Sequence, residues 1–164
     1  MSVVDELVEA NRHFAEAAGR IEDPQLPPRR GVAILTCMDA RIVPARLFGL
    51  EEGDAHVIRN AGGLAREGLR SLVISQRLLG TSAIAVVHHT DCGMLTFENE
   101  DVHAKVQEDL GADASDIDFM PFGDLEQSVR DDVDFLEQSP LIAEDTEIRG
   151  FVYNVETRRM TEVT

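Results

Sequence analysis

The amino-acid sequence predicts an α/β fold, with a central, mostly parallel β-sheet flanked by helices. Two apolar runs, residues 32–36 and 83–87, have the length and composition of strands that are buried on both faces. Between them, strand and helix patterns alternate at a spacing that is typical of βαβ units, in which the strands are parallel. Polar side chains follow each run directly, so the predicted sheet places them at one edge.

The chain begins with a predicted helix over residues 3–18, which Gly19 ends. Its apolar residues recur at helical spacing: Val4, Leu7, Val8, Phe14, Ala15 and Ala18. Three prolines, Pro24, Pro27 and Pro28, then predict an extended connector to the first strand.

The remaining elements are predicted from apolar periodicity and from turn and cap residues. They are, in order, a strand near 31–37, a short helix over 43–48, a strand over 55–59, a helix from Leu69 to Gly80, a strand over 83–88, a polar helix over 100–110, a loop over 111–123, a helix from Asp124 to Ser139, and a last strand over 147–155 with a turn at 156–159. Pro44 suits a first helical turn, and Asp124 with Gln127 resembles a capping box. All of residues 1–164 are expected to form one domain.

The composition excludes several classes of protein. No apolar run approaches the ~20 residues that a membrane span needs, and the N-terminus lacks a signal-peptide pattern, so a cytoplasmic protein is expected. With 31 acidic and 15 basic residues, the net charge is −16, which disfavours nucleic acid and anionic membranes as partners. Lys105 is the only lysine. This balance resembles that of halophilic proteins, although an ordinary acidic protein is the alternative.

Both cysteines of the chain lie where a predicted strand ends. Cys37 follows the first apolar run, together with Asp39 and Arg41, and His89 and Cys92 follow the second. If the two strands are parallel in one sheet, these side chains emerge at the same edge. Two thiolates and an imidazole are zinc ligands, and three protein ligands leave a fourth position open. A disulfide is the alternative, which a reducing cytosol disfavours.

Two motifs together resemble the β-class carbonic anhydrases, and most of all their small archaeal and bacterial members. They are C-x-D-x-R at residues 37–41 and H-x-x-C at residues 89–92. Residues 11–14, 58–62 and 139–142 are also similar to that family, so the resemblance spans nearly the whole chain. It implies reversible hydration of carbon dioxide to bicarbonate and a proton by zinc-bound hydroxide. It also implies a homodimer or a tetramer, with the N-terminal helix on the partner subunit.

The resemblance also implies the roles of the site residues. Cys37, His89 and Cys92 would hold the zinc ion, and Asp39 and Arg41 would act in catalysis. Asp39 can accept the hydrogen bond of the hydroxide while Arg41 holds its carboxylate. In some members of the family the equivalent acid binds zinc instead, and the sequence leaves both arrangements open. The loop after the second predicted strand supplies two candidates for substrate binding: Asn60 and Gly62.

Two further residues border the predicted ligands. His88 precedes His89 in the predicted strand, where neighbours point to opposite faces, so it is not expected to bind the same metal. It either packs or relays protons at the mouth of the site. Asp91 is expected to orient the ligand loop.

Three functions are compatible with these residues. Carbon dioxide hydration is the leading prediction, because no inserted segment is present that would build a narrow tunnel for larger, apolar substrates. Hydrolysis of carbonyl sulfide or carbon disulfide at the same site is the second. A zinc-binding protein without turnover is the third, and the complete Asp39–Arg41 pair disfavours it, because a structural zinc usually has four protein ligands.

Overall fold

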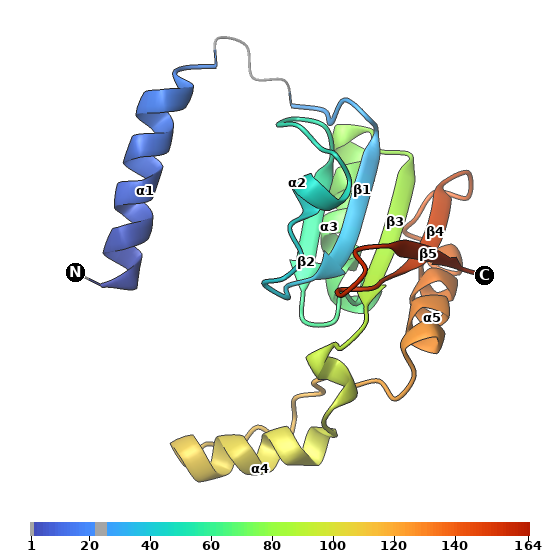
Figure 1. Cartoon of the computed structure of the whole chain (residues 1–164). Coiled ribbons are helices and arrows are strands. Elements are labelled where there is room, and N and C mark those ends of the chain that lie inside the picture. Colours follow the sequence, from blue (N-terminus) through green and yellow to red (C-terminus); the bar gives the residue numbers. More distant parts are fainter. Residues whose placement is uncertain (1, 22–25) are drawn as a thin grey trace.

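A five-stranded sheet with the strand order β2-β1-β3-β4-β5 forms the centre of the protein (Figure 1). The structure, a computed structural model, describes residues 2–21 and 26–164. Strands β2, β1, β3 and β4 are parallel, and β5 is antiparallel to β4. The strands are β1 (Val32–Cys37), β2 (His56–Asn60), β3 (Ala83–His89), β4 (Glu147–Tyr153) and β5 (Met160–Val163). The predicted mostly parallel α/β sheet is therefore confirmed.

Helices connect the strands and extend from the sheet. They are α1 (Val3–Ala18), α2 (Pro44–Leu47), α3 (Ala65–Leu79), α4 (Asn99–Leu110) and α5 (Leu125–Glu137), with a 3-10 helix, η1, at Gly93–Leu95. Each of the five α-helices lies where the sequence predicts one. Gly19 and Gly80 end α1 and α3 with positive φ angles of 72° and 70°, which glycine adopts without a steric cost.

The two faces of the sheet are covered differently. Helices α3 and α5 pack on one face and bury an apolar cluster that includes Leu35, Leu72 and Val86. Gly68 of α3 permits this close packing, because a Cβ atom there would lie 2.8 Å from a methyl carbon of Leu35. On the other face the short helix α2 and the loops around it contribute to a second cluster, which includes Ile34, Val87 and both cysteines.

The structure corrects two details of the sequence prediction. Residues 147–155 were expected to contain the last strand, but a further strand, β5, follows the turn and pairs with β4. Its four residues are mostly exposed and carry no apolar alternation, so periodicity could not reveal it. The expected capping box at α5 is also only half formed: Asp124 accepts from the Gln127 backbone N–H, but the Gln127 side chain donates to Asp131.

Helix α1 is set apart from the sheet (Figure 1). None of its residues, all of which the structure describes, is buried. Within residues 2–21 and 26–164, no helix is both long and apolar enough to cross a membrane. Pro24 of the predicted connector lies outside the described residues.

Candidate metal centre

Three side chains with metal-binding atoms meet at the carboxyl edge of the sheet. Cys37 ends β1, His89 ends β3, and Cys92 lies just before η1. One donor atom from each lies within 4.8 Å of the others, and all three residues are buried. Because β1 and β3 are neighbouring parallel strands, their ends are adjacent. The structure thus brings together the three residues that the sequence selects as ligands.

His89 presents an unpaired nitrogen to this cluster. Its Nδ1 donates a hydrogen bond to the Thr90 carbonyl over 2.9 Å, which leaves the lone pair on Nε2. Among the described residues, Nε2 of His89 is the one buried side-chain nitrogen or oxygen without a hydrogen-bond partner. A buried polar atom without a partner is costly, and a metal ion would satisfy it. The arrangement of donors therefore fits a tetrahedral metal ion with a further open position.

The two cysteines are free thiols in contact with each other. That contact lowers the pKa of Cys37, aided by His89 and by the backbone N–H groups of Asp39 and Gly62 and opposed by burial. The same contact, together with burial, raises the pKa of Cys92. The contact thus makes one sulfur easier and its neighbour harder to ionise, and a divalent cation would favour the ionised form of both.

Asp39 lies beside the cluster and is held by Arg41. The Arg41 side chain donates to both carboxylate oxygens, from Nε over 3.0 Å and from Nη2 over 2.8 Å, and its backbone N–H adds a third bond. These contacts hold the pKa of Asp39 at about 2 although partial burial opposes them. Oδ2 of Asp39 lies 3.9 Å from Nε2 of His89, so an ionised carboxylate borders the unpaired lone pair.

Arg41 also joins the two loops that carry the cluster. Its guanidinium donates to the side chain of Asp91 and, over 2.9 Å, to the Asp91 carbonyl. Asp91 has a positive φ of 56°, an uncommon conformation for a residue other than glycine. One arginine thus spans the loop after β1 and the loop after β3, and the expected role of Asp91 in orienting the ligand loop acquires a physical basis.

Comparison with known proteins gives one consistent result. A sequence model of the family described as Carbonic anhydrase matches residues 32–118. A protein of Mycobacterium tuberculosis named Beta-carbonic anhydrase 1 is 41% identical, over 100% of this chain and 99% of the relative. This chain belongs to the β-carbonic anhydrase family.

Solved structures agree with this membership of the β-carbonic anhydrase family. The crystal structure of a carbonic anhydrase from Streptococcus mutans has a TM-score of 0.94 and 48% identity, over 100% of this chain and 99% of that one. The sequence also resembles a carbon disulfide hydrolase of Acidianus, at 34% identity over 82% of this chain and 78% of the relative.

His88 has surroundings quite unlike those of its neighbour His89. It is fully buried on the face covered by α5, where Nδ1 lies 2.8 Å from Oγ of Ser128 and Nε2 lies 3.1 Å from Oδ2 of Asp132. Its ring stacks on Phe122. The prediction that His88 does not join the ligand cluster is confirmed. A proton relay at the mouth of the site is wrong, because the ring has no exposed surface and both nitrogens are engaged.

Two residues that sequence reasoning did not select shape the first ligand loop of this β-carbonic anhydrase. Arg59 donates to the carbonyl of Cys37 over 3.0 Å and to that of Asp39 over 2.7 Å. Gly63 lies against the same loop, since a Cβ atom there would approach the Cys37 backbone nitrogen to 2.8 Å. A charged residue at the end of the predicted strand over 55–59 was the available signal for Arg59.

Asn60 is the last residue of β2, and Gly62 lies in the loop that follows it. The Asn60 amide donates to the Leu64 carbonyl and accepts from the Leu64 backbone N–H, so its side chain closes this loop. Gly62 has a φ of 83°, and its backbone N–H points to the Cys37 sulfur. The loop is therefore fixed in place beside the ligand cluster.

Proposed function

We propose that this protein catalyses the reversible hydration of carbon dioxide to bicarbonate and a proton. The observation that carries the proposal is the unpaired, buried Nε2 of His89, which faces two cysteine sulfurs beside an ionised carboxylate. Membership of the β-carbonic anhydrase family supports the same reaction.

The metal of this proposal is zinc, held by Cys37, His89 and Cys92. Two sulfurs and one imidazole are zinc ligands, and three protein ligands are typical of a catalytic rather than a structural site. Zinc bound there would lower the pKa of a water molecule and so would supply the nucleophile.

The chain's own residues position the reactants in this proposal. The Asp39 carboxylate, ionised at all working pH values, accepts a hydrogen bond from the nucleophile and so aims its lone pair at the carbon of the substrate. Arg41 donates to both oxygens of the carboxylate and so would oppose its turning toward a bound metal ion. We further propose that Asn60 and Gly62 contribute to substrate binding through the loop that they hold in place.

Hydrolysis of carbon disulfide is the second candidate, because several relatives carry that name. The Acidianus relative matches 82% of this chain, whereas the mycobacterial β-carbonic anhydrase matches all of it at higher identity. The more complete match favours carbon dioxide. Carbonyl sulfide hydrolysis belongs to the same alternative, and a zinc-binding protein without turnover is a third.

Steady-state rates on purified protein of measured zinc content decide between these functions. Carbon dioxide hydration is followed by stopped-flow with a pH indicator, and carbonyl sulfide and carbon disulfide hydrolysis by sulfide release. The expected result is fastest turnover of carbon dioxide. Faster turnover of either sulfur substrate would reverse the assignment, and zinc-loaded protein inactive on all three would leave the non-catalytic function. Arg130→Gln, on α5, serves as the control variant.

A homodimer, or a tetramer built from dimers, completes the proposal, with α1 lying on the partner subunit. The apolar side chains of α1 are exposed, at 67% for Val4, 65% for Leu7 and 64% for Phe14. A helix that leaves an apolar stripe in water gains stability by burying it. A hollow of about 200 Å³ is available to receive it, lined by Val32, Ala85 and Phe151 on the face of the sheet opposite α3 and α5 and bordered by the charged Glu147 and Arg149.

Light scattering after size exclusion tests this assembly. The double variant Leu7→Gln and Phe14→Gln is expected to lower the molar mass, because it removes apolar surface from the stripe of α1. Glu9→Gln with Glu16→Gln, on the polar face of the same helix, is the matched control. An unchanged mass in the first variant, or a monomeric wild type, would contradict the assembly.

We also propose a cytoplasmic location and adaptation to a high-salt interior. Two free thiols suit a reducing compartment. The net charge of −16 makes the protein self-repulsive at low salt, and concentrated salt screens that repulsion.

A further inference from the structure

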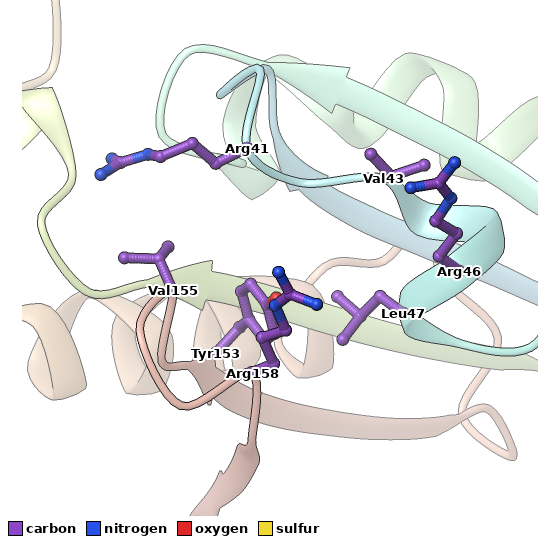
Figure 2. A pocket seen from close by; sticks show the side chains of 7 residues that line it. All are labelled: Arg41, Val43, Arg46, Leu47, Tyr153, Val155 and Arg158. Atoms are coloured by element: carbon purple, nitrogen blue, oxygen red, sulfur yellow. The ribbon is translucent and has the colours of Figure 1, made fainter.

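A cavity of about 520 Å³ lies between α2 and the segment that follows β4 (Figure 2). Two segments far apart in the sequence, 41–47 and 153–158, supply its lining residues: Arg41, Val43, Arg46, Leu47, Tyr153, Val155 and Arg158. None of the three residues of the Cys–His–Cys cluster is among them. The cavity therefore has its own walls, and it adjoins the candidate metal centre through Arg41 and through Tyr153, which pairs with His89 in the sheet.

The walls of this cavity are basic in a protein that is strongly acidic. The chain has 31 acidic and 15 basic residues, yet three of the seven lining residues are arginines and none is a carboxylate. Arg41 is occupied by Asp39 and Asp91. Arg46 and Arg158 form no ion pair and no side-chain hydrogen bond within the described part of the chain. Two unpaired guanidinium groups facing one cavity favour an anion there.

Tyr153 adds a further donor. The residue is only 7% exposed, and its hydroxyl makes no hydrogen bond to the residues that the structure describes. The hydroxyl oxygen is not among the buried atoms that lack a partner, so it is open to the cavity that the side chain lines. The O–H group is therefore available to donate a hydrogen bond to a bound molecule.

The turn that carries Arg158 is held in an uncommon conformation. Arg158 has a φ of 60°, which costs free energy for a residue with a Cβ atom. Its backbone N–H donates to the Asn154 carbonyl over 2.8 Å, and the Asn154 side chain accepts from the N–H groups of Glu156 and Thr157. These bonds fix the position of Arg158 at the cavity, where Figure 2 shows its side chain rising from the turn.

We propose that this cavity is a second ligand site, which binds a small organic anion with at least two negative charges. Phosphate or carboxylate groups of the ligand pair with Arg46 and Arg158 and accept from the Tyr153 hydroxyl. The apolar part of the ligand contacts Val43, Leu47 and Val155. The volume, far larger than a single oxyanion fills, accommodates both parts.

The cavity contains its own spectroscopic reporter. The chain has one tyrosine and no tryptophan, so its intrinsic fluorescence comes mainly from Tyr153. The full-length, zinc-loaded protein is titrated at low salt with inorganic phosphate, glycerol 3-phosphate and succinate, by fluorescence and by calorimetry. Saturable binding of at least one probe is expected, and the comparison of the three separates phosphate from carboxylate recognition. Molar chloride is expected to weaken the binding by competition.

Variants connect that signal to the cavity. Arg46→Gln and Arg158→Gln are each expected to weaken binding ~10-fold or more, as the loss of a charge-assisted hydrogen bond predicts. Arg46→Lys, which keeps the charge but not the planar fork, should recover part of the affinity. Arg130→Gln removes the same charge from α5, outside the cavity, and should change the affinity less than ~2-fold, since exposed charges are screened. Circular dichroism confirms that each variant is folded.

Three results would overturn the proposal. One is the absence of saturable binding by any of the three probes. Another is equal weakening by Arg130→Gln and by the cavity variants, which would show a response to overall charge alone. The third is a loss of subunit association in Arg46→Gln without any effect of the probes, which would show that a second copy of the chain fills the cavity.

Discussion

His88 and His89 are adjacent in β3, and both side chains are completely buried, yet their hydrogen bonding differs entirely. His88 points to the face covered by α5, where Ser128 and Asp132 engage both of its nitrogens. His89 points to the opposite face, where one nitrogen donates to the Thr90 carbonyl and the other has no partner in the described chain. Burial alone therefore does not distinguish a structural histidine from a ligand. The unpaired lone pair does.

The largest expected effect comes from substituting each of the two histidines separately. His89→Ala should abolish tight zinc binding and activity, because it removes one of three ligands. His88→Gln should keep roughly one zinc per chain, because this residue lies on the other face of the sheet. Elemental analysis after dialysis measures both. Full zinc content in His89→Ala, or in both Cys37→Ser and Cys92→Ser, would show that the ligand assignment is wrong.

The second effect concerns the Asp39–Arg41 pair (the dyad), which lies on the same face of the sheet as His89. Asp39→Asn should retain zinc while kcat falls ~100-fold, since the acceptor that orients the nucleophile is weakened. Arg41→Ala should lower kcat similarly and should also speed zinc release, because Arg41 joins both ligand loops. Stopped-flow rates and zinc exchange into a chromogenic chelator report the two effects. A wild-type rate in either variant would remove the dyad from the mechanism.

The third effect is on the His88 side and is one of stability. Ser128→Ala and His88→Gln are each expected to lower the free energy of unfolding by about 1–3 kcal/mol, since each leaves a buried polar group without its partner. Chemical denaturation with circular dichroism measures this change. The matched control is Gln127→Ala, whose side chain bonds only at the surface of α5. Loss of zinc at unchanged stability would contradict the separation of the two histidines.

Salt should stabilise the protein by screening repulsion between its surface carboxylates, and this effect should not depend on either histidine. The melting temperature is expected to rise by several degrees between low salt and 1 M, where the Debye length falls to ~3 Å. The rise should be the same in wild type and in His88→Gln, because the relevant carboxylates are exposed. A melting temperature that stays constant or falls would refute the halophilic hypothesis.

The smallest effect is the contribution of Asp39 to acid stability. The folded pKa of Asp39 is about 2, below its ordinary value of 3.8, because Arg41 stabilises the carboxylate. A depressed pKa contributes stability above the unfolded value, and that contribution is lost as pH falls from about 4 toward about 2. The free energies of unfolding of wild type and of Asp39→Asn should therefore converge as the pH falls through this window. Parallel curves through it would argue against an ionised Asp39.

The sequence was sufficient to predict the ligand cluster, for a physical reason. Two apolar strands in a parallel sheet place their carboxyl ends together, so Cys37, His89 and Cys92 converge whatever the details of packing. Alternation along β3 likewise separates His88 from that cluster. These two rules depend only on the strand direction and on the period of two.

Other features depend on contacts that no local pattern encodes. Strand β5 is short and exposed, and it forms because the turn around Asn154 returns the chain to β4. The partners of His88 lie 40 and 44 residues away, on α5. The basic cavity joins α2 to a turn more than a hundred residues later in the sequence, and Arg59 acts through backbone carbonyls. None of these pairings has a signature in the spacing of residues.

The hydrogen bonds of Arg41 determine how ordered the ligand loops are before a metal ion binds. They connect the two ligand loops without using a sulfur or the free imidazole nitrogen, and the bond from His89 to Thr90 fixes the ring as well. Most of the ordering entropy of the site is therefore spent during folding rather than during metal capture. The folded chain would therefore present an ordered set of donor atoms to a metal ion before that ion binds.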